Sequence, residues 1–311
     1  CNVISELDVG ASSALLALEW NYCKPKLSKK NIFKVCNGRH PVLEQIIYEK
    51  SDSRFLGNDC ELDENNNIWL ITGPNMAGKS TFLRQNALIN ILAQMGSYVP
   101  ADEAKIGIAD RIFSRVGSGD DITKGQSTFM LEMIETASIV NQSSKNSFII
   151  LDEIGRGTST WDGLSLAWSI IEYINENIGA KTLFATHYHE LSALQKTIEK
   201  LSLHHFDVKD INDEITFLYK IIKGTANKSY GIEVAKLAGL PKTILDRAKQ
   251  VLLKLENPSK LNKVFGDLPL FKEKQNVVEN NLIQEKLNKI DPDKISPMQA
   301  LQILYDLKKN S

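Results

Sequence analysis

The sequence predicts an α/β fold in which a mainly parallel central sheet is flanked by helices. Between residues 72 and 190, strand-like apolar runs alternate with helix-like segments, a pattern typical of parallel sheets with helical crossovers. A glycine-rich loop lies between one such run and the helix after it. Residues 199–222 alternate like further strands, and residues 31–71 are interpreted as short strands and loops with a turn at Asn37-Gly38.

The expected elements follow one another along the chain. A helix covers residues 1–22 and ends before Pro25, and a buried strand covers residues 68–71, just ahead of the glycine-rich loop. Apolar residues at helical spacing then continue to Gly96. The other expected elements are a helix over 130–140, strands over 148–151 and 182–185, a helix over 164–178 ended by Gly179, and a helix from Pro241 to about Glu256.

The glycine-rich loop has the spacing of a phosphate-binding P-loop, Gly-x-x-x-x-Gly-Lys-Ser. A strand, such a loop and a helix together point backbone N–H groups and a helix N-terminus at a phosphate, which disfavours a chance match. Lys79 is expected to reach the β- and γ-phosphates, and Ser80 to ligate Mg²⁺. The expected ATP-binding loop residues are Gly73, Pro74, Asn75, Met76, Ala77, Gly78, Lys79, Ser80 and Thr81.

Two carboxylates follow the strand over 148–151. After a P-loop, such a strand is expected to bind Mg²⁺ through Asp152, directly or through water. Glu153 would face the γ-phosphate and deprotonate the attacking water. The alternative is an exposed acidic pair at a strand end. The next segment, Gly155–Gly163, is rich in small and hydroxyl residues. It could report the nucleotide state to a neighbour, or be a turn with Asp162 as the cap of the following helix.

Two further residues stand at ends of predicted elements. His187 follows the strand over 182–185 and could hydrogen-bond the γ-phosphate; a solvated histidine is the alternative. Ser127 precedes the helix over 130–140 and would be its N-cap. Because a helix N-terminus with hydroxyl groups favours anions, this end could contact the γ-phosphate of ATP bound to a second subunit; a plain helix cap is the alternative.

Composition bounds the class of protein. The 311 residues suffice for one or two domains, and 42% apolar with 24% charged residues is ordinary for a soluble globular protein. No apolar run is long enough to cross a membrane. The net charge of −1 argues against this chain being the main nucleic-acid-binding module. Scattered cysteines indicate a reducing compartment, and the start at Cys1 suggests a fragment of a longer protein.

The C-terminal part has a different composition. Residues 257–286 are rich in Lys, Asn and Glu and are expected to form a flexible linker. Residues 287–311 predict a turn and an amphipathic helix that begins at Ser296-Pro297. So short a module cannot bury its own core, so its apolar face would pack on a partner helix or back on the main domain.

Together these motifs resemble the ATPase domain of the MutS family of DNA mismatch repair proteins, within the ABC ATPase superfamily. The resemblance also includes Gly38-Arg39-His40-Pro41, Lys228–Gly231 and Ala238–Pro241. It implies an ABC-type P-loop fold with an antiparallel β subdomain. It also implies that residues 1–25 end the lever helices and that residues 26–256 form the ATPase domain with its dimerisation helices. Residues 287–311 would form a helix-turn-helix oligomerisation tail.

The resemblance further implies a Mg-dependent ATPase with two composite sites in a homodimer. Ser127 would act across the interface, Phe55 would stack on adenine, and Tyr219 would also contact the base. Ala77, Gln126 and Trp161 replace the glycine, arginine and tyrosine common in the family, without removing a chemical role. Implied partners are mismatched duplex DNA, bound through domains outside this chain, a MutL-type protein and, through the tail, a tetramer. The implied location is the bacterial cytoplasm, on the nucleoid when DNA is bound.

Two other functions are considered. A MutS paralogue could use nucleotide as a clamp in recombination or ribosome rescue, with little turnover. The paralogue that carries a C-terminal nuclease is disfavoured, because the chain ends in the oligomerisation-like tail. A small-molecule kinase would leave Ser127 and the Asp162 region unexplained. The mismatch-reading domain of the family is not in this sequence, so the chain is expected to hydrolyse ATP and self-associate without recognising a mispair.

Overall fold

A computed structural model describes residues 2–74, 76–117, 127–211, 214–225, 230–255 and 298. The chain divides into two compact units, Cys1–Pro241 and Lys242–Ser311. The described part of the second unit is essentially one helix, α7 (Lys242–Leu255), which begins one residue after the predicted start at Pro241. The predicted linker over 257–286 lies outside the described residues, and so does the tail over 287–311 apart from Met298.

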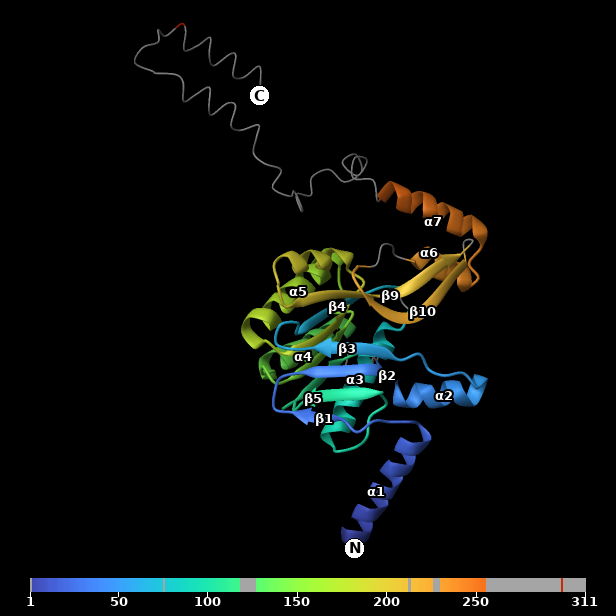
Figure 1. The fold of residues 1–311 in the computed structure, drawn as a ribbon. Helices are drawn as coiled ribbons and strands as arrows, with labels where there is room; N and C mark the ends of the chain where they lie inside the picture. Colours follow the sequence, from blue (N-terminus) through green and yellow to red (C-terminus); the bar gives the residue numbers. More distant parts are fainter. Residues whose placement is uncertain are drawn as a thin grey trace. The chain divides into compact units, whose positions relative to one another are not determined.

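The central sheet of the first unit has six strands in the order β10-β9-β4-β8-β7-β6 (Figure 1). Neighbouring strands from β9 to β6 pair in parallel, and only β10 is antiparallel to its neighbour. This arrangement confirms the predicted mainly parallel fold. The bounds are β4 (Ile68–Thr72), β6 (Ile112–Arg115), β7 (Phe148–Asp152), β8 (Lys181–Ala185), β9 (Leu201–Ile211) and β10 (Glu214–Lys223).

A second sheet of four strands confirms the predicted β subdomain. Its order is β1 (Lys26–Ser28), β5 (Glu103–Gly107), β2 (Phe33–Gly38) and β3 (Asn58–Leu62). β2 pairs antiparallel with both β5 and β3. The turn expected at Asn37-Gly38 is wrong: both residues belong to β2, where the register with β3 shifts and Asn37 has a φ of 49°. The Asn-Gly pair therefore forms an irregularity within a strand.

The first unit also contains helices. Their bounds are α1 (Asn2–Glu19), α2 (Pro41–Ser51), α3 (Lys79–Gln94), α4 (Thr128–Gln142), α5 (Thr160–Tyr173) and α6 (Gly231–Leu237). A π-helical turn, Ile174–Ile178, continues α5 and ends at Gly179 in the left-handed conformation, as predicted. A 3₁₀ segment, His189–Lys196, follows β8.

Two helix predictions need correction. Residues 31–71 contain a helix, α2, in addition to strands and loops; Pro41 occupies its first turn and the His40 imidazole accepts from the amides of Val42 and Leu43. The cap of α5 is Ser159, whereas Asp162 lies in the first turn and accepts from the Ser159 hydroxyl at 2.7 Å. Ser159 and Asp162 thus form a reciprocal cap, which begins α5 at Thr160, earlier than predicted.

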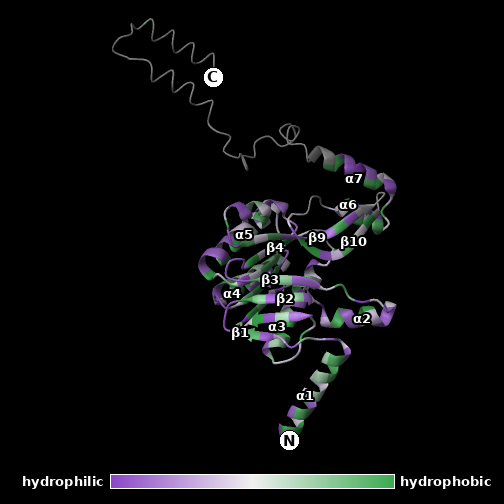
Figure 2. Cartoon of the chain, in the orientation of Figure 1, coloured by the Kyte–Doolittle hydropathy of each residue, from purple (hydrophilic) through white to green (hydrophobic). Residues whose placement is uncertain are grey.

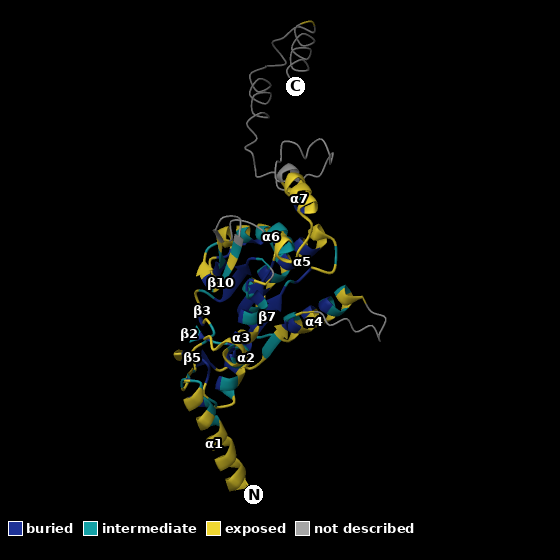
Figure 3. Ribbon diagram, turned by 90° about the vertical axis from the view of Figure 1, so that its right-hand side faces the viewer, coloured by how far each residue is buried: buried dark blue, intermediate teal, exposed yellow. Residues whose placement is uncertain are grey.

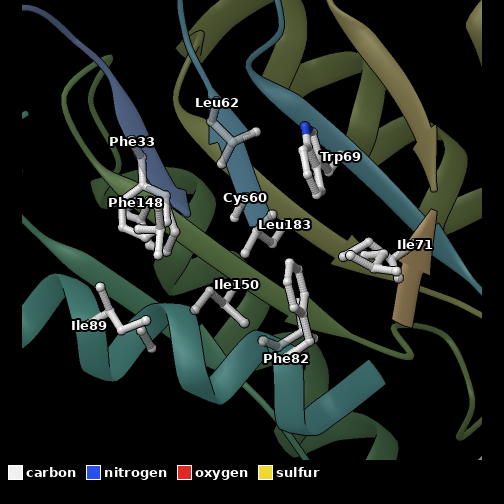
Figure 4. Packing of buried hydrophobic residues seen from close by; sticks show 14 of the residues in the cluster. Phe33, Cys60, Leu62, Trp69, Ile71, Phe82, Ile89, Phe148, Ile150 and Leu183 are labelled. Atoms are coloured by element: carbon white, nitrogen blue, oxygen red, sulfur yellow. The ribbon is translucent and has the colours of Figure 1, made fainter. Parts of the chain in front are cut away.

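Hydrophobic clusters lie on both faces of the central sheet, because successive residues of a strand point to opposite faces. Phe148 and Ile150 of β7 belong to the cluster that includes Phe82 and Leu83 of α3 (Figure 4). Ile149 and Leu151 belong to the cluster that includes residues of α5. β4, β7 and β8 are buried at every position, which explains their continuous apolar sequences.

α1 is exposed along its length, with Ala17 as its one buried residue (Figure 3). Hydrophobic residues are distributed along it (Figure 2), and the large exposed ones are Val3, Ile4, Leu7, Val9, Leu15 and Leu18. Within the part of the chain that the structure describes, no helix is long and apolar enough to cross a membrane.

Candidate nucleotide-binding site

The P-loop connects β4 to α3, as the sequence predicts. Gly73 and Gly78 have φ values of 135° and 107°, a backbone region that glycine adopts without strain. Gly78 is also the N-terminal cap of α3. A Cβ atom at position 78 would lie 3.3 Å from the Phe206 ring, so there is little room for a side chain there. The loop therefore presents backbone at the helix N-terminus, where an anion is stabilised.

Lys79 is folded into this loop. Its side chain is nearly buried, with the residue 4% exposed, and Nζ donates to the Gly73 carbonyl oxygen at 2.6 Å. The Glu153 Oε1 atom lies 3.7 Å from Nζ. Burial lowers the pKa of Lys79, and the nearby Glu153 and Asp152 carboxylates partly oppose that effect. The loop thus holds an ammonium group where an anionic ligand would offset its desolvation.

Asp152 and Ser80, the two expected cation ligands, lie within hydrogen-bond distance of each other. Asp152 ends β7, is buried, and its carboxylate accepts a hydrogen bond from the Ser80 side chain. Its Oδ1 atom is buried without a hydrogen-bond partner within the described structure. Burial raises the pKa of Asp152. Because an unpartnered buried carboxylate oxygen is costly and Mg²⁺ prefers oxygen ligands, these residues fit a bound Mg²⁺.

Glu153 sits in a strained backbone position beside them. Its φ is 52°, which is rare for a residue other than glycine, and its N–H donates to the Ala185 carbonyl at the end of β8. Its Oε2 atom lies 2.7 Å from Arg156 Nη1. Arg156 was not predicted as a site residue; its spacing of three residues from Glu153 was the available signal. Strained residues persist where the surroundings determine the geometry, often at functional sites.

A cavity of about 590 Å³ joins the P-loop to an apolar wall. Phe55 and Tyr219, from distant parts of the sequence, both line it, which brings the two predicted base-contacting rings together. Leu43 and Ile47 of α2 also line the cavity, and the sequence analysis missed them because it did not predict this helix. The predicted loop residues that line it are Pro74, Met76, Gly78, Lys79, Ser80 and Thr81. Glu153 borders the cavity as well.

The remaining loop residues have other positions. Ala77 is fully buried in the hydrophobic cluster beneath the loop, where a small side chain fits. Asn75 lies outside the described residues. Gly73 lines a neighbouring cavity of about 310 Å³ together with Glu153 and His187, so the histidine is brought to the acidic end of the site. The surrounding protein desolvates the His187 ring and lowers its pKa.

Ser127 is the N-cap of α4, as predicted, and its hydroxyl accepts from the Met130 amide at 3.1 Å. It does not line either of the cavities described above. A single chain thus brings together the P-loop, Asp152, Glu153, His187, Phe55 and Tyr219, and leaves Ser127 on a separate surface element.

Comparisons with known proteins agree with this geometry. A family model described as MutS domain V matches residues 69–256, and a second, described as the DNA mismatch repair protein MutS C-terminal region, matches residues 278–310. Similar proteins include the DNA mismatch repair protein MutS of Rickettsia canadensis, 51% identical over 98% of this chain, and that of Rickettsia prowazekii, 50% identical over 99%. The chain spans 35% of the length of each. With a P-loop site on the matching fold and a family model that covers more than half of its length, the chain belongs to the MutS family.

Proposed function

We propose that this chain binds ATP with Mg²⁺ and hydrolyses it to ADP and phosphate. The observation that carries the proposal is the cavity shared by Lys79, Ser80, Phe55, Tyr219 and Glu153. One end offers aromatic faces for a base, and the other offers a buried ammonium and a glycine-rich helix N-terminus for phosphates. Carboxylates for metal and water lie next to the phosphate end.

The residues would divide the work. Lys79 and the loop amides bind and orient the β- and γ-phosphates, and Ser80 and Asp152 would hold Mg²⁺, which supplies charge neutralisation when bound. Glu153 accepts a proton from water as the water oxygen attacks the γ-phosphorus and ADP departs with the electron pair of the broken bond. His187 donates a hydrogen bond to a γ-phosphate oxygen.

In the whole protein, we infer that this ATPase drives mismatch repair. The relatives reported above are named DNA mismatch repair protein MutS, which favours that role over recombination or ribosome rescue. ATP binding would close a homodimer and change how other segments hold mismatched duplex DNA; hydrolysis would reset it. The tail over 287–311 would support tetramers, and a MutL-type protein would respond to the ATP-bound state. The proposed location is the bacterial cytoplasm.

The Glu153→Gln variant tests the hydrolytic proposal. Loss of the proton acceptor should lower kcat by at least about a hundredfold, while a fluorescent ATP analogue still binds with Mg²⁺. Glu199→Gln is the matched control, because Glu199 is exposed and does not line either cavity. Wild-type hydrolysis that survives Glu153→Gln would show that another group accepts the proton. No analogue binding by the wild-type chain would refute the ATP site itself.

A further inference from the structure

The peptide groups at Gly155, two residues after Glu153, are held by two buried side chains. The Gly155 N–H donates to Oε1 of Glu132, which lies on α4. The Gly155 carbonyl accepts from the Tyr188 hydroxyl at 3.0 Å. Glu132 is 5% exposed and Tyr188 is 4% exposed. Both hydrogen bonds therefore act away from water, where losing one partner leaves an unsatisfied group.

The surroundings leave no room for a side chain at Gly155. Gly155 has a φ of 89°, and a Cβ there would lie 2.6 Å from the Gly163 Cα. A Cβ on Gly163 would clash with the Gly155 carbonyl oxygen and the Tyr188 hydroxyl. The loop thus packs directly on α5 with no space for a methyl group. We call Glu132 and Tyr188, which hold the Gly155 peptide by these two hydrogen bonds, the clamp. Because the packing here is so close, a displacement of the Gly155 peptide would also displace its neighbouring residues.

Glu132 is itself anchored from the sheet. Its Oε2 atom lies 3.9 Å from Nη2 of Arg115, the last residue of β6, and Arg115 also donates to the Gly117 carbonyl. The Nε atom of Arg115 lies 2.8 Å from the Glu135 carboxylate. The clamp residue is therefore fixed by a partly buried ionic network and does not move freely with the loop.

The clamp acts on Glu153 through a short chain of fixed groups. The Glu153 N–H is tied to the Ala185 carbonyl, and the next residue, Ile154, is fully buried. Gly155 is then held by Glu132 and Tyr188. Anchors on both sides explain how Glu153 keeps its left-handed backbone. Neither Glu132 nor Tyr188 lines the cavities that contain Glu153, so neither is placed to touch substrate.

We propose that Glu132 and Tyr188 are positioning residues, which clamp the Gly155 peptide and thereby aim the Glu153 carboxylate at the attacking water. The inference rests on the proposed ATPase function. The same clamp joins the Glu153 loop to the helix that Ser127 caps: a Cβ on Gly157 would lie 2.9 Å from Phe129 Cβ in the first turn of α4. Movement of α4 would therefore reach the loop that follows Glu153 through its contacts with Gly155 and Gly157.

The test uses Tyr188→Phe and Glu132→Leu in the whole chain, because glutamine at position 132 could still accept from the Gly155 N–H. Tyr188→Phe removes only the hydroxyl, and Tyr173→Phe, at an exposed residue of α5, is its matched control. We expect kcat to fall about tenfold or more with KM for ATP changed less than about twofold, because misaligned groups lose rate without losing binding. In a Glu153→Gln background, Tyr188→Phe should lower the residual rate no further.

Amide hydrogen exchange over residues 153–157 separates the clamp from the chemistry. Exchange should quicken there in both variants and stay unchanged in Tyr173→Phe, with or without hydrolysis by the wild-type chain. Unchanged exchange, or quicker exchange with normal kcat, overturns the positioning role. Faster exchange across the whole chain in one variant indicates that this variant is partly unfolded, and the positioning role is then judged from the other variant. A wild-type chain that does not hydrolyse ATP refutes the proposed function, whatever the exchange shows of the clamp.

Discussion

Phe55 and Tyr219 both line the nucleotide cavity but lie in different kinds of local structure. Phe55 is half-buried in the segment between α2 and β3, whereas Tyr219 lies at a register shift within β10 and has a φ of 53°. The buried Asn58 side chain holds this shift by donating to the Tyr219 carbonyl at 2.9 Å and accepting from the Ile221 amide at 2.8 Å. The backbone geometry thus sets the position of Tyr219, and both rings line the cavity wall, where each is available to contact a base.

We therefore predict that Phe55→Ala weakens ATP binding more than catalysis. Loss of an aromatic contact worth about 1–2 kcal/mol should raise KM about 5- to 30-fold, with kcat within about twofold. Tyr219→Ala should act in the same direction. Tyr98→Ala is the control, because Tyr98 is exposed and does not line the cavity. Steady-state hydrolysis over a range of ATP concentrations gives both constants; an unchanged KM for Phe55→Ala would contradict the base-stacking role.

His204 gives the stability of the fold a defined pH dependence. Its ring stacks on Trp69 at 3.6 Å, is buried, and has a pKa lowered to about 4 by burial, assisted by the nearby Lys223 and His205. Between pH 6.5 and about pH 4, His204 is protonated in the unfolded chain but stays neutral in the folded chain. The free energy of unfolding therefore falls as the pH drops through this window, by up to about 3 kcal/mol.

Replacing this histidine should flatten that dependence. His204→Phe keeps a ring against Trp69 but cannot be protonated. Urea unfolding at several pH values from 7 to 4 should show the wild-type chain losing stability relative to His204→Phe as the pH falls below 6.5. The difference between the two proteins isolates His204 from the carboxylates that titrate in both. Parallel curves would contradict the assignment.

At the scale of elements, two helical glycines have opposite roles. Gly163 of α5 packs against the Gly155 loop without space for a methyl group, whereas nothing lies within 4 Å of a Cβ built on Gly10 of α1. We predict that Gly163→Ala destabilises the domain by about 1–3 kcal/mol through overpacking. Gly10→Ala should stabilise α1 by up to about 1 kcal/mol through its higher helix propensity. Denaturant unfolding and helical circular dichroism measure both; equal effects would contradict this difference in packing.

The elements that the sequence predicts best are those whose environment is uniform. β4, β7 and β8 are buried on both faces, so their continuous apolar sequences identify them directly. α2 is harder, because its cap is a histidine and its Ile46-Ile47-Tyr48 run favours strand on propensity. Pro41 in its first turn favours the helix, whereas packing contributes little, since Glu44 is its one buried residue. The Asn37-Gly38 error has a tertiary cause, since Gly38 pairs with Asn58 of β3 beyond the register shift and so keeps these residues in a strand.

Some residues of the candidate site can be predicted from local sequence, and others cannot. Lys79, Ser80, Asp152 and Glu153 follow from local spacing, because a strand end or a loop places them by itself. Leu43, Glu132 and Tyr188 reach the site or its supports through tertiary packing and contacts that no short motif records. The positions of Phe55 and Tyr219 came from a family resemblance, since nothing in their local sequence indicates a base.

At the scale of the whole molecule, the position of Ser127 bears on the proposed homodimer. The hydroxyl caps α4 but does not line either cavity of its own chain, so a role in hydrolysis requires a second copy. In a symmetric dimer, each site would combine Glu153 of one chain with Ser127 of the other. Specific activity should then rise with chain concentration over the range in which the dimer forms.

Mixing two inactive variants tests this arrangement. Ser127→Ala and Glu153→Gln should each abolish hydrolysis, but a mixed dimer contains one site with both residues intact. Random pairing at equal amounts makes about half of the dimers mixed, so about a quarter of wild-type activity should return. Ser127→Asn keeps a capping side chain and separates helix stability from the hydroxyl; it should behave like Ser127→Ala. If mixing restores no activity while the chains still associate, Ser127 and Glu153 must act from the same chain, and hydrolysis is completed within one chain.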